Sequence, residues 1–318
     1  MRLKVLFHDN CFDGAASAAV FSRFYREKVR PDAEIEYQGL AHKAGGAGID
    51  ESLFTGDENA IVDFRYSQAS KLTWWFDHHI SAFQQPGDEE HFRKDHSGRK
   101  FHDPTRKSCT LYIADTAREK FGFDTAPLEE LLHWAELIDG AQFDSPQQAV
   151  ELKEPALQIM TVLEATKDPE VVRGVIRDMQ TKSLGEIAAA PYIAEPFGVL
   201  FERHRKNIEV VRNKIVVENG VVSFDVADEG LDSLNKFISY YLHPEARYTV
   251  WVGRSPSRAK VSIGSNPWRP QERRHDLSKL AERYGGGGHP VVAAISFAST
   301  DLDKARKAAS EILAELRA

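Results

Sequence analysis

The stretch Leu72-Thr73-Trp74-Trp75-Phe76-Asp77-His78-His79 decides the predicted fold of this chain. Bulky residues over 72–75 predict a buried strand, and a carboxylate and two histidines follow where that strand ends. In an open α/β sheet, ligands bind in the crevice beyond the carboxyl ends of the strands. Imidazole and carboxylate groups together favour Mn²⁺, Zn²⁺ or iron over Ca²⁺ and Mg²⁺. Taken alone, such a triplet also fits an ordinary surface, so a metal site is predicted only if other strand ends carry similar groups.

The first predicted strand also ends in polar groups. It covers residues 3–7 and is followed by His8, and Asp13 then precedes a small-residue helix predicted to end near residue 29. A helix N-terminus favours anions, so this strand–loop–helix junction is a second candidate for a ligand site. A plain surface turn is the alternative explanation of both residues.

Two further elements end in carboxylates. A strand over 34–40 is followed by a strand over 59–62, which ends at Asp63. A helix over 128–138 ends at Asp139-Gly140, and Gly140 is expected as the residue that closes it. Because parallel strands end at one edge of their sheet, these carboxylates are expected to lie near the two histidines.

Other segments carry less chemistry. The glycine-rich loop over 43–48 lacks the ending of a phosphate-binding loop. The basic insertion over 91–107 is expected to be a solvated loop, and a lip that attracts phosphates is the alternative. Ser108 is expected to cap a helix that runs to residue 121. Residues 149–214 predict helices broken at four prolines, namely Pro155, Pro169, Pro191 and Pro196.

The second half of the chain predicts a smaller mixed sheet. Strands are expected over 215–217, 220–224, 248–252, 259–263 and 291–297, and helices over 234–241, 277–284 and 302–316. The run Gly285-Gly286-Gly287-Gly288-His289-Pro290 is costly in conformational entropy. It predicts a loop whose N–H groups form a nest for an anion, with His289 as an additional donor. A flexible loop is the alternative.

Composition narrows the function classes. The chain has 318 residues, of which 42% are hydrophobic and 28% charged, and its net charge is -7. The charge argues against nonspecific nucleic-acid binding but is compatible with a small anionic substrate in a local positive pocket. Two cysteines, no signal peptide and no apolar run near the roughly 20 residues of a membrane span predict a cytoplasmic protein without a membrane partner.

The groups at the predicted element ends together indicate a dinuclear metal site. One carboxylate is expected to bridge two divalent ions, which activate a water molecule and hold a phosphoryl oxygen. The candidate residues are His8, Asp13, Asp63, Asp77, His78, His79 and Asp139.

With these motifs in place, the chain resembles the DHH phosphoesterase family over nearly its whole length. Asp77-His78-His79 matches the signature triplet, and Gly286-Gly287-Gly288-His289 matches the signature of the DHH-associated C-terminal domain. The segment from His8 to Gly14 resembles the first motif, Asp63 the second and Asp139 the fourth.

The resemblance implies an α/β fold. Its DHH domain, with a parallel sheet, is expected over residues 1–190 and a helical linker over 191–214. A smaller mixed α/β domain is expected over 215–318, with a substrate cleft between the domains. The resemblance also implies one or two divalent ions, usually Mn²⁺. It implies ligand roles for His8, Asp13, Asp63, His78 and Asp139, with Asp63 as the bridge, and catalytic roles for His79, near the substrate phosphate, and Asp77, which supports the histidines. The residues expected to bind the substrate are Arg269, Gly287, Gly288 and His289.

The expected function is hydrolysis of phosphodiester or phosphomonoester bonds in a short single-stranded oligonucleotide or a small nucleotide. Family members include single-strand exonucleases, nanoRNases, bisphosphate phosphatases, dinucleotide phosphodiesterases and family II pyrophosphatases. The alternatives are a polyphosphate or pyrophosphate hydrolase and a non-catalytic nucleotide sensor with an incomplete metal site. The oligomeric state is left open, a dimer included.

Two departures from the family pattern bear on the site. Cys11 takes the place of the first aspartate of the first motif, so one metal position is weak or is completed by Cys11, Asp9 or water. A thiolate ligand favours a softer ion such as Zn²⁺. Gly264 stands where many oligoribonuclease-like members have an arginine. Either Arg258, Lys260 or Arg269 supplies the missing positive charge, or the substrate differs.

Overall fold

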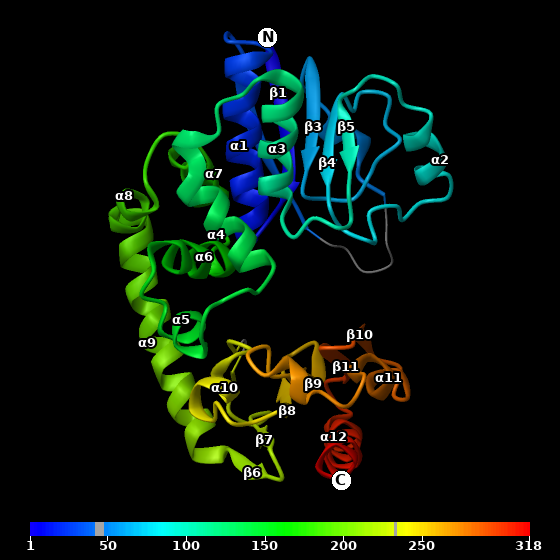
Figure 1. Cartoon of the computed structure of the whole chain (residues 1–318), viewed down its shortest axis with the longest axis vertical. Coiled ribbons are helices and arrows are strands. Elements are labelled where there is room, and N and C mark those ends of the chain that lie inside the picture. The colour runs from blue at the N-terminus through cyan, green and yellow to red at the C-terminus, as the bar shows by residue number, and fades with distance from the viewer. Residues whose placement is uncertain (42–47, 232–233) are drawn as a thin grey trace. The chain divides into compact units, whose positions relative to one another are not determined.

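The computed structural model describes residues 1–41, 48–231 and 234–318, so the predicted loop over 43–48 lies almost wholly outside the described residues. The chain forms two compact units, which are described one at a time. The first comprises Met1–Phe143 and Lys153–Gly198, and the second Asp144–Leu152 and Val199–Ala318. Figure 1 labels their helices and strands.

Five parallel strands form the sheet of the first unit, in the order β2-β1-β3-β4-β5. β3 and β4 are buried along nearly their whole length, as expected of central strands in a parallel sheet with both faces covered. β2 lies on one side of β1 and β3 on the other, so the topological switch point lies at the carboxyl ends of β1 and β3. The strands are β1 (Arg2–His8), β2 (Glu34–Leu40), β3 (Glu58–Val62), β4 (Trp74–Asp77) and β5 (Lys100–His102).

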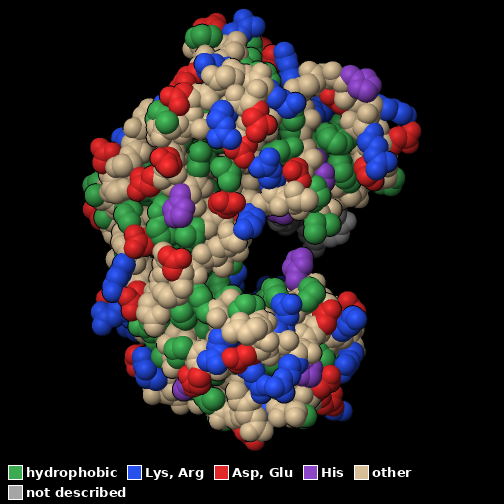
Figure 2. All heavy atoms as spheres, in the orientation of Figure 1, with side chains coloured by type: hydrophobic (Ala, Val, Ile, Leu, Met, Phe, Trp, Pro, Cys, Tyr) green, Lys and Arg blue, Asp and Glu red, His purple; other side chains and the backbone are tan. Residues whose placement is uncertain are grey.

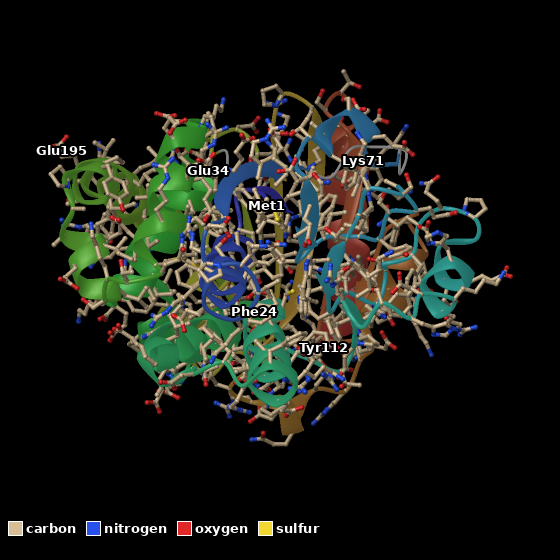
Figure 3. All side chains as sticks on the ribbon, turned by 90° about the horizontal axis from the view of Figure 1, so that it is seen from above. Met1, Phe24, Glu34, Lys71, Tyr112 and Glu195 are labelled. Atoms are coloured by element: carbon tan, nitrogen blue, oxygen red, sulfur yellow. The ribbon has the colours of Figure 1, made fainter. Side chains whose placement is uncertain are left out.

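Two helices, α1 and α3, pack side by side on one face of this sheet, and α4 packs against both (Figures 1 and 3). Phe24 of α1, labelled in Figure 3, joins the helices to the sheet: its ring centroid lies 5.9 Å from that of Trp74 and 5.1 Å from that of Phe121. Neighbouring strand residues point to opposite faces, so Trp75 instead packs on the other face, against Phe92. The three helices are α1 (Phe12–Lys28), α3 (Cys109–Phe121) and α4 (Glu129–Asp139).

The basic insertion over 91–107 is more regular than the sequence predicted. It contains β5 and the end of α2 (Asp88–Arg93), and β5 places His102 beside Asp77 of β4. A three-residue strand among charged residues has too little alternation to be recognised locally. Most of the insertion's cations are paired with carboxylates, namely Arg93 with Glu89, Lys94 with Glu90, Lys100 with Asp95 and Arg106 with Asp115.

The predicted helical region is helical, but one of its expected breaks is wrong. Pro155, Pro169 and Pro191 each begin a helix, where the N–H group that proline lacks is not needed. Pro196 lies inside α9, past its first turn, and does not end the helix. The helices are α5 (Pro146–Glu151), α6 (Pro155–Ala165), α7 (Pro169–Asp178), α8 (Leu184–Ala189) and α9 (Pro191–Lys214), with 3-10 turns η1 (Glu51–Leu53) and η2 (Ala126–Leu128) earlier in the chain.

The second unit contains the predicted mixed sheet, in the order β10-β11-β9-β8-β7-β6. Only β7 and β8 are parallel among its described pairs. Apolar residues of β8, β9 and β11 form its core with α11 and α12. The strands are β6 (Val216–Glu218), β7 (Val221–Asp225), β8 (Tyr248–Arg254), β9 (Arg258–Ser265), β10 (Gly287–His289) and β11 (Val292–Ala298). The helices are α10 (Ile238–Leu242), α11 (Leu277–Glu282) and α12 (Leu302–Arg317), with the turn η3 (Pro270–Glu272).

Two predictions in this unit are wrong in detail. The helix expected over 234–241 begins only at Ile238. The glycine run is not a loop throughout, because Gly287–His289 pair with β11 as an edge strand. Local sequence favours a loop there, and only the neighbouring strand provides the pairing partner. None of the helices in the described parts of the chain is long and apolar enough to cross a membrane.

Candidate metal centre

The predicted site residues of the first unit meet at the switch point of its sheet. His8 ends β1, Asp63 follows β3, and Asp77 ends β4. Asp13 lies in the first turn of α1, not in the preceding loop, and Asp139 is the last residue of α4. The three strand ends are adjacent because β1, β3 and β4 are neighbours in the sheet.

Asp63 lies at the centre of this group. Its backbone has a left-handed φ of 56°, a conformation that costs a non-glycine residue free energy. The N–H group of Asp63 donates to the carbonyl of Phe76 at 2.9 Å, which holds the turn against β4. The carboxylate is only 1% exposed; Oδ2 lies 3.3 Å from His8 Nδ1 and Oδ1 lies 3.4 Å from His78 Nε2. One carboxylate thus faces two histidines.

Asp77 orients both histidines of the triplet. It is fully buried, and its Oδ1 accepts hydrogen bonds from the backbone N–H groups of His78 at 2.8 Å and His79 at 3.2 Å. The same oxygen lies 2.7 Å from Nδ1 of His79 and, by this hydrogen bond, raises the pKa of that imidazole. The triplet is therefore a unit in which the carboxylate holds the backbone of both histidines and the ring of His79.

The tautomer of His78 follows from its second contact. Its Nδ1 lies 3.0 Å from the carbonyl oxygen of Arg106, and a carbonyl only accepts, so Nδ1 carries the proton. In the neutral ring Nε2 then carries the lone pair. Nε2 lies 3.5 Å from Asp139 Oδ2 and 3.8 Å from Asp13 Oδ2. No sequence motif revealed this contact between His78 and the Arg106 carbonyl.

The N-terminus of α3 holds Asp13 in place. The N–H groups of Cys109 and Thr110 donate to its carboxylate at 2.7 and 3.1 Å, and the Thr110 hydroxyl donates to its backbone carbonyl at 3.1 Å. Ser108 caps this helix as predicted, accepting from the N–H group of Leu111. That cap was the one sequence signal of a helix start here, but it did not show which carboxylate the helix would bind.

The end of α4 differs from the prediction by one residue. Gly140 has a right-handed backbone, and Ala141, with φ 50°, is the left-handed residue that closes the helix. The N–H groups of Ala141 and Gln142 donate to the carbonyls of Ile138 and Leu137. Gly140 is required for another reason: a Cβ there would lie 2.9 Å from the carbonyl oxygen of Glu136. This arrangement holds Asp139 at the helix end.

The electrostatics of the site favour a cation. Burial and the charges of Asp63 and Asp139 raise the pKa of Asp13 well above its usual range. Burial would lower the pKa of His78, but its close contact with Asp63 and the charge of Asp13 raise it to about 10. Burial would also raise the pKa of Asp63, and its close contacts with His78 and His8 outweigh that effect and lower it.

Two buried atoms at the centre lack hydrogen-bond partners. Asp63 Oδ1 and His78 Nε2 are both inaccessible to solvent and have no partner within hydrogen-bonding geometry among the described residues. An unsatisfied buried carboxylate oxygen costs free energy, and a metal ion is the usual way to satisfy such groups. The imidazole and carboxylate donors suit a divalent transition-metal ion, so the residues present fit the expected metal.

Three groups of potential ligands are close enough to share ions. In each group the ligand atoms lie within 4.8 Å of one another: His8, Cys11 and Asp63; Asp63, His78 and His79; and Asp13, His78 and Asp139. Asp9 belongs to none of them, because its carboxylate lies against Gly39 of β2, where an added Cβ would be 2.5 Å from it. Cys11, not Asp9, is therefore the group that adjoins the site.

The substrate-binding candidates lie in the second unit. Gly287, Gly288 and His289 are exposed on β10. A Cβ on Gly288 would lie 2.4 Å from the carbonyl oxygen of Val292, so glycine there permits close pairing with β11. Arg269 is paired with Glu272, its Nε 2.8 Å from Oε1. On the face shown in Figure 2, Lys and Arg side chains of this unit are interspersed with Asp and Glu.

No family model and no curated protein matches this sequence. Among solved structures, the pGpG-specific phosphodiesterase PggH from Vibrio cholerae aligns over 98% of this chain and 99% of its own, with a TM-score of 0.71 and 18% identity. The DHH domain of a member of the s1p family of ribosomal proteins aligns over 98% and 86%, with a TM-score of 0.63 and 16% identity. RecJ from Thermus thermophilus, in complex with Mn²⁺, aligns over 99% and 52%, with a TM-score of 0.53 and 13% identity. The chain therefore has the α/β fold of the DHH-domain proteins.

Proposed function

We propose that the protein is a metal-dependent phosphoesterase that hydrolyses phosphodiester or phosphomonoester bonds of small nucleotides or short single-stranded oligonucleotides. The observation that carries the proposal is the pair of buried, unpartnered atoms, Asp63 Oδ1 and His78 Nε2, at the centre of the carboxylate and histidine groups. The fold adds support, because it is shared with a pGpG-specific phosphodiesterase and with RecJ, which was solved with Mn²⁺.

The metal ligands in this proposal are His8, Asp13, Asp63, His78 and Asp139, holding one or two divalent ions, with Mn²⁺ as the expected ion. Asp63 is the proposed bridge because its two oxygens face different histidines. A bound divalent ion supplies Lewis-acid polarisation of a phosphoryl oxygen and eases the deprotonation of a water molecule.

His79 is the proposed contact to the substrate phosphate. Asp77 holds its Nδ1, and the imidazole is half-exposed, so its other ring nitrogen is available to an incoming ligand. The hydrogen bond to Asp77 raises the pKa of His79 and favours the protonated ring, which can donate to a phosphate oxygen. Asp77 acts through this histidine and not on the substrate.

The second unit is proposed to bind the part of the substrate away from the scissile bond, through Arg269, Gly287, Gly288 and His289. Binding energy from remote contacts can be used to position the reacting group. In this proposal the catalytic domain covers 1–190, a helical linker 191–214 and the substrate domain 215–318, and the substrate occupies a cleft between the two domains.

The test is a phosphate-release and product assay with Mn²⁺ on a panel of substrates. The panel contains short RNA and DNA oligomers, linear and cyclic dinucleotides, a 3′,5′-bisphosphate, and pyrophosphate and polyphosphate as the rival substrates. Asp63→Asn should abolish hydrolysis while the circular dichroism spectrum is unchanged. Asp9→Asn is the matched control, since this carboxylate lies near the same strand end but outside the ligand groups. Full activity of Asp63→Asn would disprove the site.

A further inference from the structure

Cys11 lies beside two side chains that are able to bind a metal ion. Its thiol, a ring nitrogen of His8 and a carboxylate oxygen of Asp63 are all within 4.8 Å of one another. Cys11 is the residue before α1, with an extended backbone, and its side chain makes no capping hydrogen bond to that helix. The thiol is therefore not used to satisfy the helix start, which is the usual task of a side chain at this position.

A second observation concerns the carboxylate of this group. Asp63, which is 1% exposed, keeps Oδ1 buried without a hydrogen-bond partner, 3.4 Å from His78 Nε2, while its Oδ2 lies 3.3 Å from His8 Nδ1. A buried carboxylate oxygen in this condition is costly unless a cation satisfies it. The thiol is thus adjacent to a carboxylate that itself requires a positive partner.

The neighbouring ligand group has different chemistry. Asp13, His78 and Asp139 offer two carboxylates and one imidazole, whereas His8, Cys11 and Asp63 offer one imidazole, one sulfur and one carboxylate. Oxygen-rich groups suit harder ions such as Mn²⁺, and thiolate ligands select softer ions such as Zn²⁺. The group with the thiol is therefore expected to prefer Zn²⁺, and the group with two carboxylates is expected to prefer Mn²⁺.

We propose that Cys11 is a metal ligand and makes the two positions unequal: a Zn²⁺ position formed by His8, Cys11 and Asp63, and a Mn²⁺ position formed by Asp13, His78 and Asp139, with Asp63 shared between the two. The proposal rests on the proposed function in that both positions belong to the same hydrolytic site. Binding at the first position converts the thiol to a thiolate, and its proton is released to water. Three protein donors leave a coordination position open, as in catalytic zinc sites.

The experiment starts from metal-free full-length protein. Co²⁺, used as a spectroscopic substitute for Zn²⁺, should give a thiolate-to-cobalt charge-transfer band that is lost in Cys11→Ser. The Zn²⁺ affinity of Cys11→Ser should fall by at least about 10–100-fold, the loss seen when only a partner of a metal ligand is removed. Cys11→Asp should bind Mn²⁺ at both positions, measured by elemental analysis, without the charge-transfer band.

The matched control is the second cysteine. Cys109 is fully buried and donates to the carbonyl of Phe76, so Cys109→Ser should keep the band. In the wild type, Zn²⁺ should slow alkylation of Cys11 by iodoacetamide, read by peptide mass mapping, and this measurement does not depend on a variant that folds.

The inference is overturned if Co²⁺ binds without the band, if the band survives in Cys11→Ser, or if Zn²⁺ leaves the alkylation rate unchanged. Phosphate release without any thiolate signature would refute the role of Cys11 and leave the phosphoesterase proposal intact. The thiolate signature without phosphate release on the whole panel would support the ligand and refute the proposed function.

Discussion

Asp77→Asn tests whether Asp77 positions the histidines or binds metal itself. The substitution keeps the shape of the side chain and one oxygen that can accept the three hydrogen bonds now made by Oδ1. It removes the charge that strengthens the contact with His79. It also places an amide N–H₂ group at Oδ2, which is buried and has no hydrogen-bond partner in the described structure.

The expected size of each effect follows from these contacts. A hydrogen bond to a charged group is worth about 1.5–3 kcal/mol and a neutral one about 0.5–1.5 kcal/mol, so the His79 contact should weaken by about 1.4 kcal/mol. If this loss appears in the transition state, kcat falls about tenfold. Because Oδ2 already lacks a partner, the amide that replaces it should change the free energy of unfolding little.

Three measurements separate positioning from ligation. The Mn²⁺ affinity of Asp77→Asn, from calorimetry, should stay close to that of the wild type, whereas Asp63→Asn should lose it. In the metal-free protein, loss of the Asp77 charge should lower the pKa of His79, so that its imidazole NMR signals titrate at lower pH. The reasoning is refuted if Asp77→Asn loses Mn²⁺ affinity as severely as Asp63→Asn, because Asp77 would then be a ligand.

Three further predictions concern the other parts of the site. His289→Ala should reduce turnover of a dinucleotide by about 10–100-fold, the value of one or two hydrogen bonds to a phosphate. Turnover of bis-p-nitrophenyl phosphate should hardly change, and equal losses on both substrates would contradict the separate roles of the units. Gly288→Ala should disrupt pairing of β10 with β11, because the new Cβ would lie 2.4 Å from the carbonyl oxygen of Val292, and hydrogen exchange of Gly287–His289 should rise while Mn²⁺ affinity is unchanged. Mn²⁺ at about 100 times its Kd should stabilise the wild type by about 2.7 kcal/mol in thermal unfolding, and this gain should vanish in Asp63→Asn. If the variant keeps the gain, the ion does not bind at Asp63.

The sequence alone determined the framework of the first unit. Apolar runs with polar groups at their ends predicted β1, β3 and β4 within one or two residues at each end, and the strand expected over 34–40 coincides with β2. Such runs are readable because a buried parallel strand must be apolar along its whole length. The motif at Asp77-His78-His79 and the glycine run supplied the resemblance to DHH proteins, and the solved structures confirm that fold.

The sequence also indicated which side chains should converge, although their roles stay predictions. His8, Asp63 and Asp77 were expected together because strand ends of a parallel sheet share one edge. In the structure Asp63 lies 3.3 Å from His8, and Asp77 contacts His79, whose Nδ1 is 3.9 Å from Asp63. The rule concerns backbone topology, so it holds without knowledge of side-chain packing.

Only the tertiary structure decided how those side chains are held. The carbonyl of Arg106 sets the tautomer of His78, and the N–H groups of Cys109 and Thr110 hold Asp13 from α3. These donors and acceptors are backbone groups, present at nearly every residue, so no residue type marks them. Likewise β10 and β5 exist because a neighbouring strand offers its own N–H and C=O groups. Local pattern carries no record of partners distant in sequence, and that is why these features emerged only from the folded chain.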